Sequence, residues 1–186
     1  MIDSLHQFQE RVEQLIAFLD DTEVISALLS HPMLEDEENT GASSVWSHLV
    51  RLRSSKISRR IQTYASSIIL LYGLFEQYVE DVLVAYIEEI DSTITNFDDV
   101  PDKIRQSHTN LSAQLLINRE LDKYRDRCNE ADIILRMHSC MHGGPFRLNA
   151  LAFTDHKSNF RIEPLNRFFE MAGISGMSAC IKTTAA

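Results

Sequence analysis

The chain has 186 residues, of which 44% are apolar and 24% are charged, and this composition is typical of a globular protein rather than a disordered or fibrous one. Three cysteines without a CxxC pair exclude a disulfide framework and a thioredoxin-like motif, so we expect reduced thiols. No apolar stretch approaches the ~20 residues of a membrane span, and the amino terminus lacks the basic and apolar regions of a signal peptide. We therefore expect a cytoplasmic protein that does not enter a membrane.

Charge is distributed unevenly along the chain. Residues 1–44 carry ten acidic side chains and one basic side chain, whereas residues 45–186 carry equal numbers of each. Inside this balanced part, five cations follow one another without an intervening anion, at Arg51, Arg53, Lys56, Arg59 and Arg60. This cationic run has two interpretations: it binds a phosphate backbone, or it neutralises the acidic amino-terminal segment within the chain or across a dimer.

The first 65 residues predict two helices separated by an acidic loop. Residues 3–30 place apolar side chains at helical spacing, at Leu5, Phe8, Val12, Leu15, Ile16 and Leu19. Pro32 ends this helix, and residues 35–41 form an acidic loop. Ser43 or Ser44 can cap a second helix, on which Arg53, Lys56 and Arg60 share one face.

The most apolar part of the chain predicts a central helix over residues 66–91. Its first half is apolar on nearly all sides, which is typical of a helix surrounded by others, and Gly73 favours a close helix crossing. We expect one core that contains Ile69, Leu70, Phe75, Val79, Leu83 and Phe168.

The remaining residues predict shorter helices. Residues 92–101 form a connection, Pro101 begins a short helix, and residues 111–127 and 130–141 form two more helices. Residues 146–160 are expected to be a loop. Pro164 begins the last helix, and Gly173 with Ile174 ends it in a Schellman motif. Because no alternation with a period of two occurs, we predict an all-α single domain of at least five helices.

Three segments of the chain carry a family resemblance. Residues 67–80, SIILLYGLFEQYVE, resemble the central helix of HEPN domains of the RiboL-PSP-HEPN and related groups. Residues 130–140 and 156–174 are similar to the same group in their order and spacing. The resemblance implies a helical bundle found in prokaryotic defence and toxin–antitoxin systems, where many HEPN proteins are dimeric, metal-independent endoribonucleases. We accordingly divide the chain into an acidic helix and loop (1–44), a HEPN-like bundle (45–174) and a tail (175–186).

The resemblance also implies a catalytic motif of Arg, four to six residues, and His at the head of the final helix. A histidine can take the 2′-hydroxyl proton, and an arginine can hold the scissile phosphate. Here no Arg or His follows Arg167. We consider two explanations: a chain truncated at the start of its last helix, which we favour, and a degenerate, non-catalytic member.

The candidate site residues follow from these patterns. Arg136 and His142 have the permitted spacing but lie too early in the chain, so a helix end with cationic side chains is the alternative. Glu76 is a candidate supporting acid or a solvated helix edge. Arg53, Lys56 and Arg60 are the phosphate-binding candidates. We expect no metal site, because Cys140 points away from the helix face that His138 and His142 share, and no cofactor motif is present.

Two functions remain open at the level of sequence. The first is a HEPN-like domain of a defence or toxin–antitoxin system that resembles endoribonucleases but, as given, does not cut RNA. The second is a non-catalytic helical module for dimerisation or interaction. The expected partners are a second copy of the chain, RNA, and a cognate antitoxin or defence protein.

Overall fold

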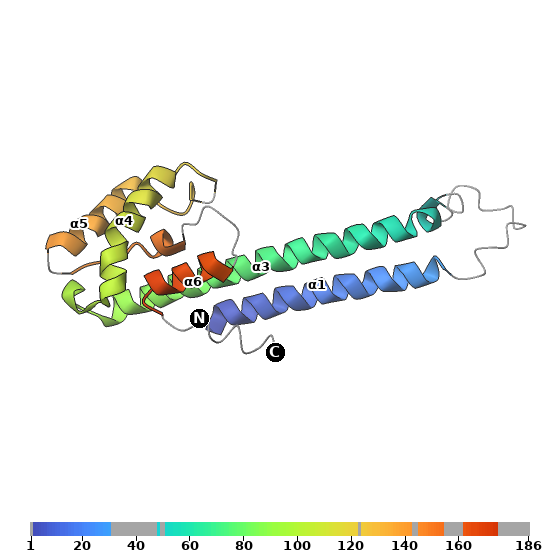
Figure 1. The fold of residues 1–186 in the computed structure, drawn as a ribbon, viewed down its shortest axis with the longest axis horizontal. Helices are drawn as coiled ribbons and strands as arrows, with labels where there is room; N and C mark the ends of the chain where they lie inside the picture. The colour runs from blue at the N-terminus through green and yellow to red at the C-terminus, as the bar shows by residue number, and fades with distance from the viewer. Residues whose placement is uncertain are drawn as a thin grey trace, which may run out of the picture. The chain divides into compact units, whose positions relative to one another are not determined.

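The structure, a computed structural model, describes residues 2–30, 48, 51–122, 124–142, 145–154 and 162–174, without the side chains of residues 162–164 and 168 (Figure 1). The expectations for Ser43, Ser44, the acidic loop, the Phe168 side chain and the tail lie outside these residues. The described residues contain the α-helices α1 and α3 to α6, a further helical stretch at residues 51–54, two 3₁₀ helices and no strand, which confirms the all-α prediction. The described chain forms two compact units, residues 2–78 (the hairpin unit) and residues 79–174 (the bundle unit).

The hairpin unit pairs α1 (Ile2–Leu28) with the first half of α3 (Lys56–Thr93) (Figure 1). Side chains meet across the two helices at Phe8 and Tyr78, Arg11 and Gln77, Glu23 and Tyr64, and Ser30 and Lys56. As the residue number rises along α1 it falls along α3, so the two helices are antiparallel. The rings of Phe8 and Tyr78 stack with their centroids 4.8 Å apart.

The predicted apolar stripe of α1 is only partly covered. Phe8, Val12, Leu15 and Leu19 are half-buried, whereas Leu5 and Ile16 are 42% and 52% exposed. A helix that meets one neighbour covers a narrow stripe, and side chains at the edges of that stripe stay in contact with solvent.

The prediction for the central helix is wrong in its first half. Ile69 and Leu70 are 71% and 54% exposed, and Phe75 is 37% exposed, whereas Val79 and Leu83 are buried as predicted. In the hairpin unit α3 packs along α1, which leaves most of its circumference uncovered. The close crossing expected at Gly73 is also absent, because a Cβ at this position would meet nothing within 4 Å.

α3 is longer than the sequence pattern indicated. It runs without interruption through residues 62–65, where the pattern had separated two helices, because this stretch contains no glycine or proline. The helical residues 51–54 end instead at a turn at Ser55. Arg53 therefore precedes α3, while Lys56 and Arg60 lie one turn apart on it.

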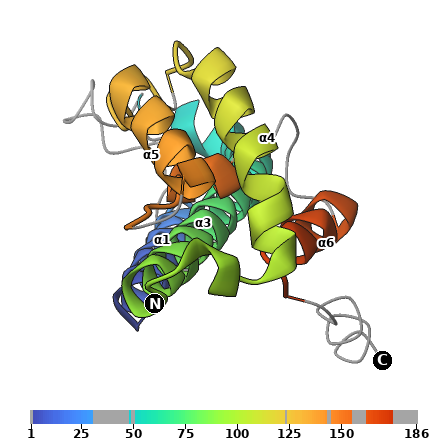
Figure 2. The same ribbon diagram turned by 90° about the vertical axis from the view of Figure 1, so that its left-hand side faces the viewer.

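The bundle unit contains the second half of α3, followed by η2 (Phe97–Asp99), α4 (Asp102–Asn118), α5 (Glu130–His142), η3 (Ala150–Thr154) and α6 (Ile162–Met171). Figure 2 shows α4 between α5 and α6. α4 is a single helix that Pro101 precedes, so the predicted break before Leu111 is absent. Residues 119–122 and 124–127 form turns rather than the predicted helical end.

The core of the bundle unit includes a segment that the sequence assigned to a loop. Residues 146–154 are buried except for the exposed Arg147 and the half-buried Leu151, and they end in η3. Leu148 and Phe153 each expose 1% of their surface and pack with Ile104, Leu115 and Ile133. The prediction failed because short apolar runs with polar interruptions show no helical period, although they can fill the space between helices.

The end of α6 agrees with the predicted Schellman motif. Gly173 has a φ of 76°, its N–H donates to the carbonyl of Glu170, and the N–H of Ile174 donates to the carbonyl of Phe169. Leu165, Phe169 and Ala172 are buried, which confirms the predicted apolar face at these three positions.

Candidate functional sites: the cationic run, the end of α5 and a buried polar cluster

The cations at the start of α3 are largely engaged within the hairpin unit. Arg60 forms an ion pair with Glu23 at 3.1 Å, and its guanidinium lies 5.7 Å from the centre of the Tyr64 ring. A hydrogen bond with Tyr64 and the negative charge of Glu23 raise the pKa of Arg60 above its usual value. The Lys56 ammonium donates to the hydroxyl of Ser30. The Arg60–Glu23 pair agrees with the interpretation in which the cationic run neutralises the acidic amino-terminal segment.

The same part of the hairpin unit contains a surface groove of about 360 Å³. Apolar side chains of α1, including Phe18 and Ile25, line it together with Leu29, which follows the helix, and α3 contributes Lys56, Arg59 and Arg60. Arg59 donates from its guanidinium to the carbonyl of Leu52. Because Arg60 and Lys56 already have partners, a phosphate in this groove would compete with Glu23 and Ser30 for them.

The end of α5 places Arg136 and His142 in different surroundings. Arg136 is half-buried, and its Nη1 donates to the carbonyl of Leu148 at 3.0 Å. His142 is exposed, its Nδ1 lies 3.0 Å from the carbonyl oxygen of His138, and the two rings stack 3.9 Å apart. Because α5 extends to His142, the two residues are about 9 Å apart along the axis and roughly 120° apart around it.

The third catalytic candidate lies elsewhere in the chain. Glu76 is half-buried on α3 within the hairpin unit, whereas Arg136 and His142 belong to the bundle unit. In the described residues, no cluster of three or more His, Cys, Asp or Glu side chains is placed to hold a metal ion. Among these residues, no helix combines the length and the apolar composition needed to cross a membrane.

A buried polar cluster in the bundle unit was missed by the sequence analysis. Its members are His108 and Ser112 of α4 and Asn149 of the segment before η3. The backbone N–H of Asn149 donates to Nε2 of His108 at 3.0 Å, and its side-chain amide donates to the Ser112 hydroxyl at 2.8 Å and to the Ile133 carbonyl at 3.2 Å. These bonds connect α4, α5 and the buried segment.

The protonation state of His108 follows from this arrangement. Burial, and secondly the nearby charge of Arg136, lower the pKa of His108 from 6.5 to about 4. Since Nε2 accepts a hydrogen bond, the neutral ring carries its proton on Nδ1, which has no partner within the described residues. His108 is therefore neutral at physiological pH and acts as a structural acceptor.

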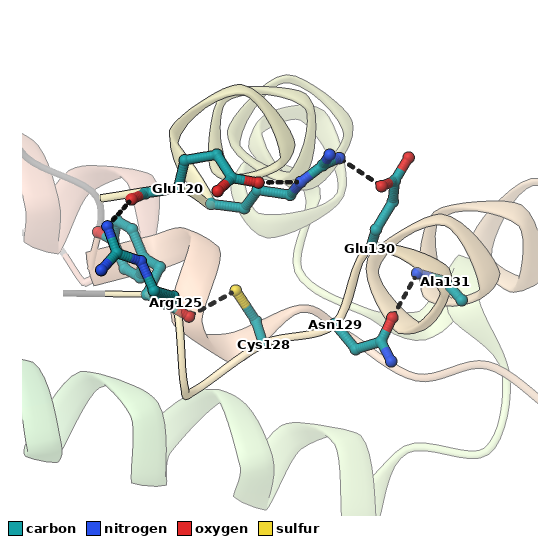
Figure 3. A network of polar contacts seen from close by, with 8 residues as sticks. Glu120, Arg125, Cys128, Asn129, Glu130 and Ala131 are labelled. Atoms are coloured by element: carbon teal, nitrogen blue, oxygen red, sulfur yellow. Dashed lines mark hydrogen bonds and ion pairs between the residues drawn. The ribbon is translucent and has the colours of Figure 1, made fainter. Parts of the chain in front are cut away.

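Polar contacts also fix where α5 begins (Figure 3). Asn129 caps the helix by accepting the N–H of Ala131 at 2.9 Å, and Arg119 pairs with both Glu120 and Glu130, at 3.2 Å and 2.5 Å. Within this connection, burial raises the pKa of the Cys128 thiol. The capped start of α5 sets the position of Arg136 two turns later.

The two described cysteines are unsuited to nucleophilic chemistry. Burial raises the pKa of Cys140 to about 11, and its thiol donates to the carbonyl of Arg147 at 3.6 Å. A protonated thiol is a poor nucleophile, and both Cys128 and Cys140 are free rather than paired.

One sequence signal could have revealed the buried cluster. His108 and Ser112 fall on the same helical stripe as Ile104, Leu111 and Leu115, all of which are buried. The prediction began the helix at Leu111, so it hid the register that places His108 inside.

Comparison with known proteins gives one match. A sequence model of the RiboL-PSP-HEPN family matches residues 44–184. No curated protein and no solved structure matches the chain. The matched residues form most of the chain, and the helical architecture of the described residues agrees with an all-α family. The chain belongs to the RiboL-PSP-HEPN family.

Proposed function

We propose that the chain is an RNA-directed HEPN module of a cytoplasmic prokaryotic defence or toxin–antitoxin system, and that the 186 residues as given do not cut RNA. Membership of the RiboL-PSP-HEPN family, matched over residues 44–184, is the observation that carries the RNA-directed role. A cognate antitoxin or other defence protein is the expected regulator.

The geometry of α5 supports the absence of cleavage by the candidate pair. A general base and a phosphate clamp must reach the same phosphodiester. Arg136 instead donates to Leu148 in the interior, and His142 stacks on His138 at the exposed helix end. Arg136 consequently has a structural role, in which it holds the buried segment against α5.

An RNA cleavage assay in the presence of a metal chelator tests this proposal. We expect the purified chain to leave a labelled single-stranded RNA intact and His142→Ala to behave identically. Arg136→Ala is expected to lower the free energy of unfolding by roughly 1–3 kcal/mol, because the Leu148 carbonyl loses a charged donor. Metal-independent cutting that disappears in His142→Ala would contradict the proposal and identify the pair as catalytic.

An exposed apolar stripe on α3 supports assembly with a second copy. Its members recur every three or four residues and are 37–75% exposed, at Ile57, Ile61, Tyr64, Ile68, Leu71 and Phe75. This spacing is that of a coiled-coil seam, in which two helices bury such residues against each other. A homodimer through this stripe also fits the dimeric state that the family resemblance implies.

Light scattering on size-separated protein tests the dimer. We expect the chain to be dimeric at micromolar concentration and Ile68→Glu to be monomeric, because a charge would be buried in the seam. Ile117→Glu is the matched control, since Ile117 is 79% exposed on α4 outside the stripe. A wild-type chain that is monomeric, or an Ile68→Glu variant that stays dimeric, would contradict this interface.

The alternative function, a non-catalytic dimerisation or interaction module, rests on the same stripe. Binding of RNA distinguishes the two, because a pure interaction module has no affinity for a labelled single-stranded oligonucleotide.

A further inference from the structure

A polar groove lies between α4 and α6 in the bundle unit, where Figure 2 shows the two helices side by side. Its volume is about 680 Å³, within the range of about 300–1,000 Å³ typical of ligand sites. α4 lines it with amide and hydroxyl side chains at Gln106, Ser107, Asn110 and Gln114. Among its described residues, the charged side chains are Lys103, Arg167 and Glu170, two cations and one anion.

The lining residues of α4 form a continuous stripe. Lys103, Ser107, Asn110 and Gln114 are spaced by three or four residues and therefore share one face of the helix. This face spans about 16 Å along the axis. At roughly 3.4 Å for each nucleotide of a stacked strand, this length matches about five nucleotides.

The polar side chains that line this groove make few contacts with other described residues. In the part of the chain that the structure describes, no hydrogen bond or ion pair engages the side chains of Lys103, Gln106, Asn110, Gln114 or Arg167. The contrast with neighbouring cations is clear, because Arg105 pairs with Asp98 at 3.4 Å and also with Asp102. The groove thus presents hydrogen-bonding and cationic groups that make no hydrogen bond or ion pair within the described residues.

We propose that the groove between α4 and α6 binds a short segment of single-stranded RNA, with Lys103 and Arg167 on its phosphates and Asn110 and Gln114 on its base edges or 2′-hydroxyls. The inference rests on the proposed RNA-directed function and gives that function a binding site. It places the site in the bundle unit, away from the cationic run that the sequence had favoured.

The chemistry of the groove favours RNA over a peptide. Amide side chains donate and accept at once, which matches base edges and the 2′-hydroxyl. A peptide site would need apolar pockets for side chains, whereas the apolar residues here are Leu111 and Met171, one buried and the other half-buried. None of the described residues that line the groove is aromatic, so the binding that we propose depends on phosphate and polar contacts.

Fluorescence anisotropy with a labelled oligouridine of about ten nucleotides tests the proposal on the full chain. The variant Lys103→Gln/Arg167→Gln is expected to lower affinity roughly 25-fold at about 0.1 M salt and to reduce the slope of log K against log salt by about 1.4. The variant Asn110→Ala/Gln114→Ala is expected to reduce the preference for the oligouridine over its deoxyribose counterpart severalfold.

A matched control separates the groove from general electrostatic attraction. Arg127→Gln/Arg147→Gln removes the same net charge from exposed positions of the bundle unit outside the groove. We expect it to keep nearly the wild-type affinity, and circular dichroism checks the fold of every variant. A 4-thiouridine oligonucleotide should crosslink to peptides from α4 and α6.

The outcomes distinguish this inference from the proposed function. A wild-type chain that binds RNA while the Lys103→Gln/Arg167→Gln variant keeps its affinity and salt slope would overturn the groove alone. An equal loss in the Arg127→Gln/Arg147→Gln control would do the same. A wild-type chain without affinity for the oligouridine would overturn both the groove and the RNA-directed function.

Discussion

Apolar residues recur at helical spacing in both units of the chain, but they are buried mainly in the bundle unit. In the bundle unit, apolar side chains from three helices and a buried segment surround one another, and even polar groups such as His108 and Asn149 are inside. In the hairpin unit, no residue of α1 is buried, and isoleucines of α3 are 64–75% exposed. A helix pair covers one stripe on each helix, whereas a third layer is needed to enclose the rest.

Apolar residues therefore have different roles in the two units. In the bundle unit, apolar residues stabilise the fold of the single chain. In the hairpin unit, the exposed apolar stripe of α3, apart from Tyr64, which bonds Glu23, presents side chains that association could bury. The predictions below test this contrast through the stability of the monomeric fold.

The largest effect is expected from truncating the core of the bundle unit. Leu115 is 1% exposed, so Leu115→Ala should lower the free energy of unfolding by about 2–5 kcal/mol. Ile69 is 71% exposed, so Ile69→Ala should change it by less than about 0.5 kcal/mol. Urea unfolding of both variants measures the difference. Equal losses would show that the first half of α3 is buried within the monomer.

A second, smaller effect concerns the pH dependence of the bundle unit. The folded protein keeps His108 neutral down to a pKa of about 4, whereas the unfolded chain takes up the proton near 6.5. His108 therefore contributes its full stability above about pH 6.5 and loses it as the pH falls toward 4, by up to about 3 kcal/mol. Urea unfolding at several pH values in this window measures the loss.

Substitution of the histidine isolates this contribution from that of the carboxylates. His108→Gln removes the titrating group, so its stability should fall less steeply between about pH 6.5 and 4 than that of the wild type. His142→Gln is the matched control, because it introduces the same side chain at an exposed histidine at the end of α5. Identical profiles for wild type and His108→Gln would show that His108 does not titrate as described.

The smallest expected effect compares two glycines. Gly73 lies mid-helix with open space around its Cβ position, so Gly73→Ala should raise the free energy of unfolding by about 0.5–1 kcal/mol. Gly173 has a φ of 76° at the end of α6, so Gly173→Ala should lower it by about 1 kcal/mol. Thermal unfolding gives the two signs directly. A destabilising Gly73→Ala would indicate a close neighbour at that position.

Local patterns predicted the elements well where one signal was sufficient. The predicted start of a helix at residue 130 agrees with α5, and the end predicted from Gly173 and Ile174 agrees with the end of α6. These features depend on neighbouring residues alone, so the sequence contains all the information needed.

Features that depend on tertiary partners could not be predicted in the same way. The apolar circumference of residues 68–71 indicated burial, yet whether a helix is covered depends on how many neighbours it meets. The buried segment 146–154 lacks a period because its residues are held by side chains of other elements. The candidate site at Arg136 was identified by spacing, but its bond to Leu148, which determines its role, joins residues twelve positions apart in the sequence.

The bonds that hold the buried segment also impose an order on folding. The N–H of Leu148 donates to Asp91, 57 positions earlier, and the N–H of Asn149 donates to His108, 41 positions earlier. Closing loops of this length costs chain entropy that local helix contacts do not. α3 and α4 can therefore form early from local contacts, whereas the segment docks only after Asp91 of α3 and His108 of α4 are in place, and its docking completes the interior of the bundle unit.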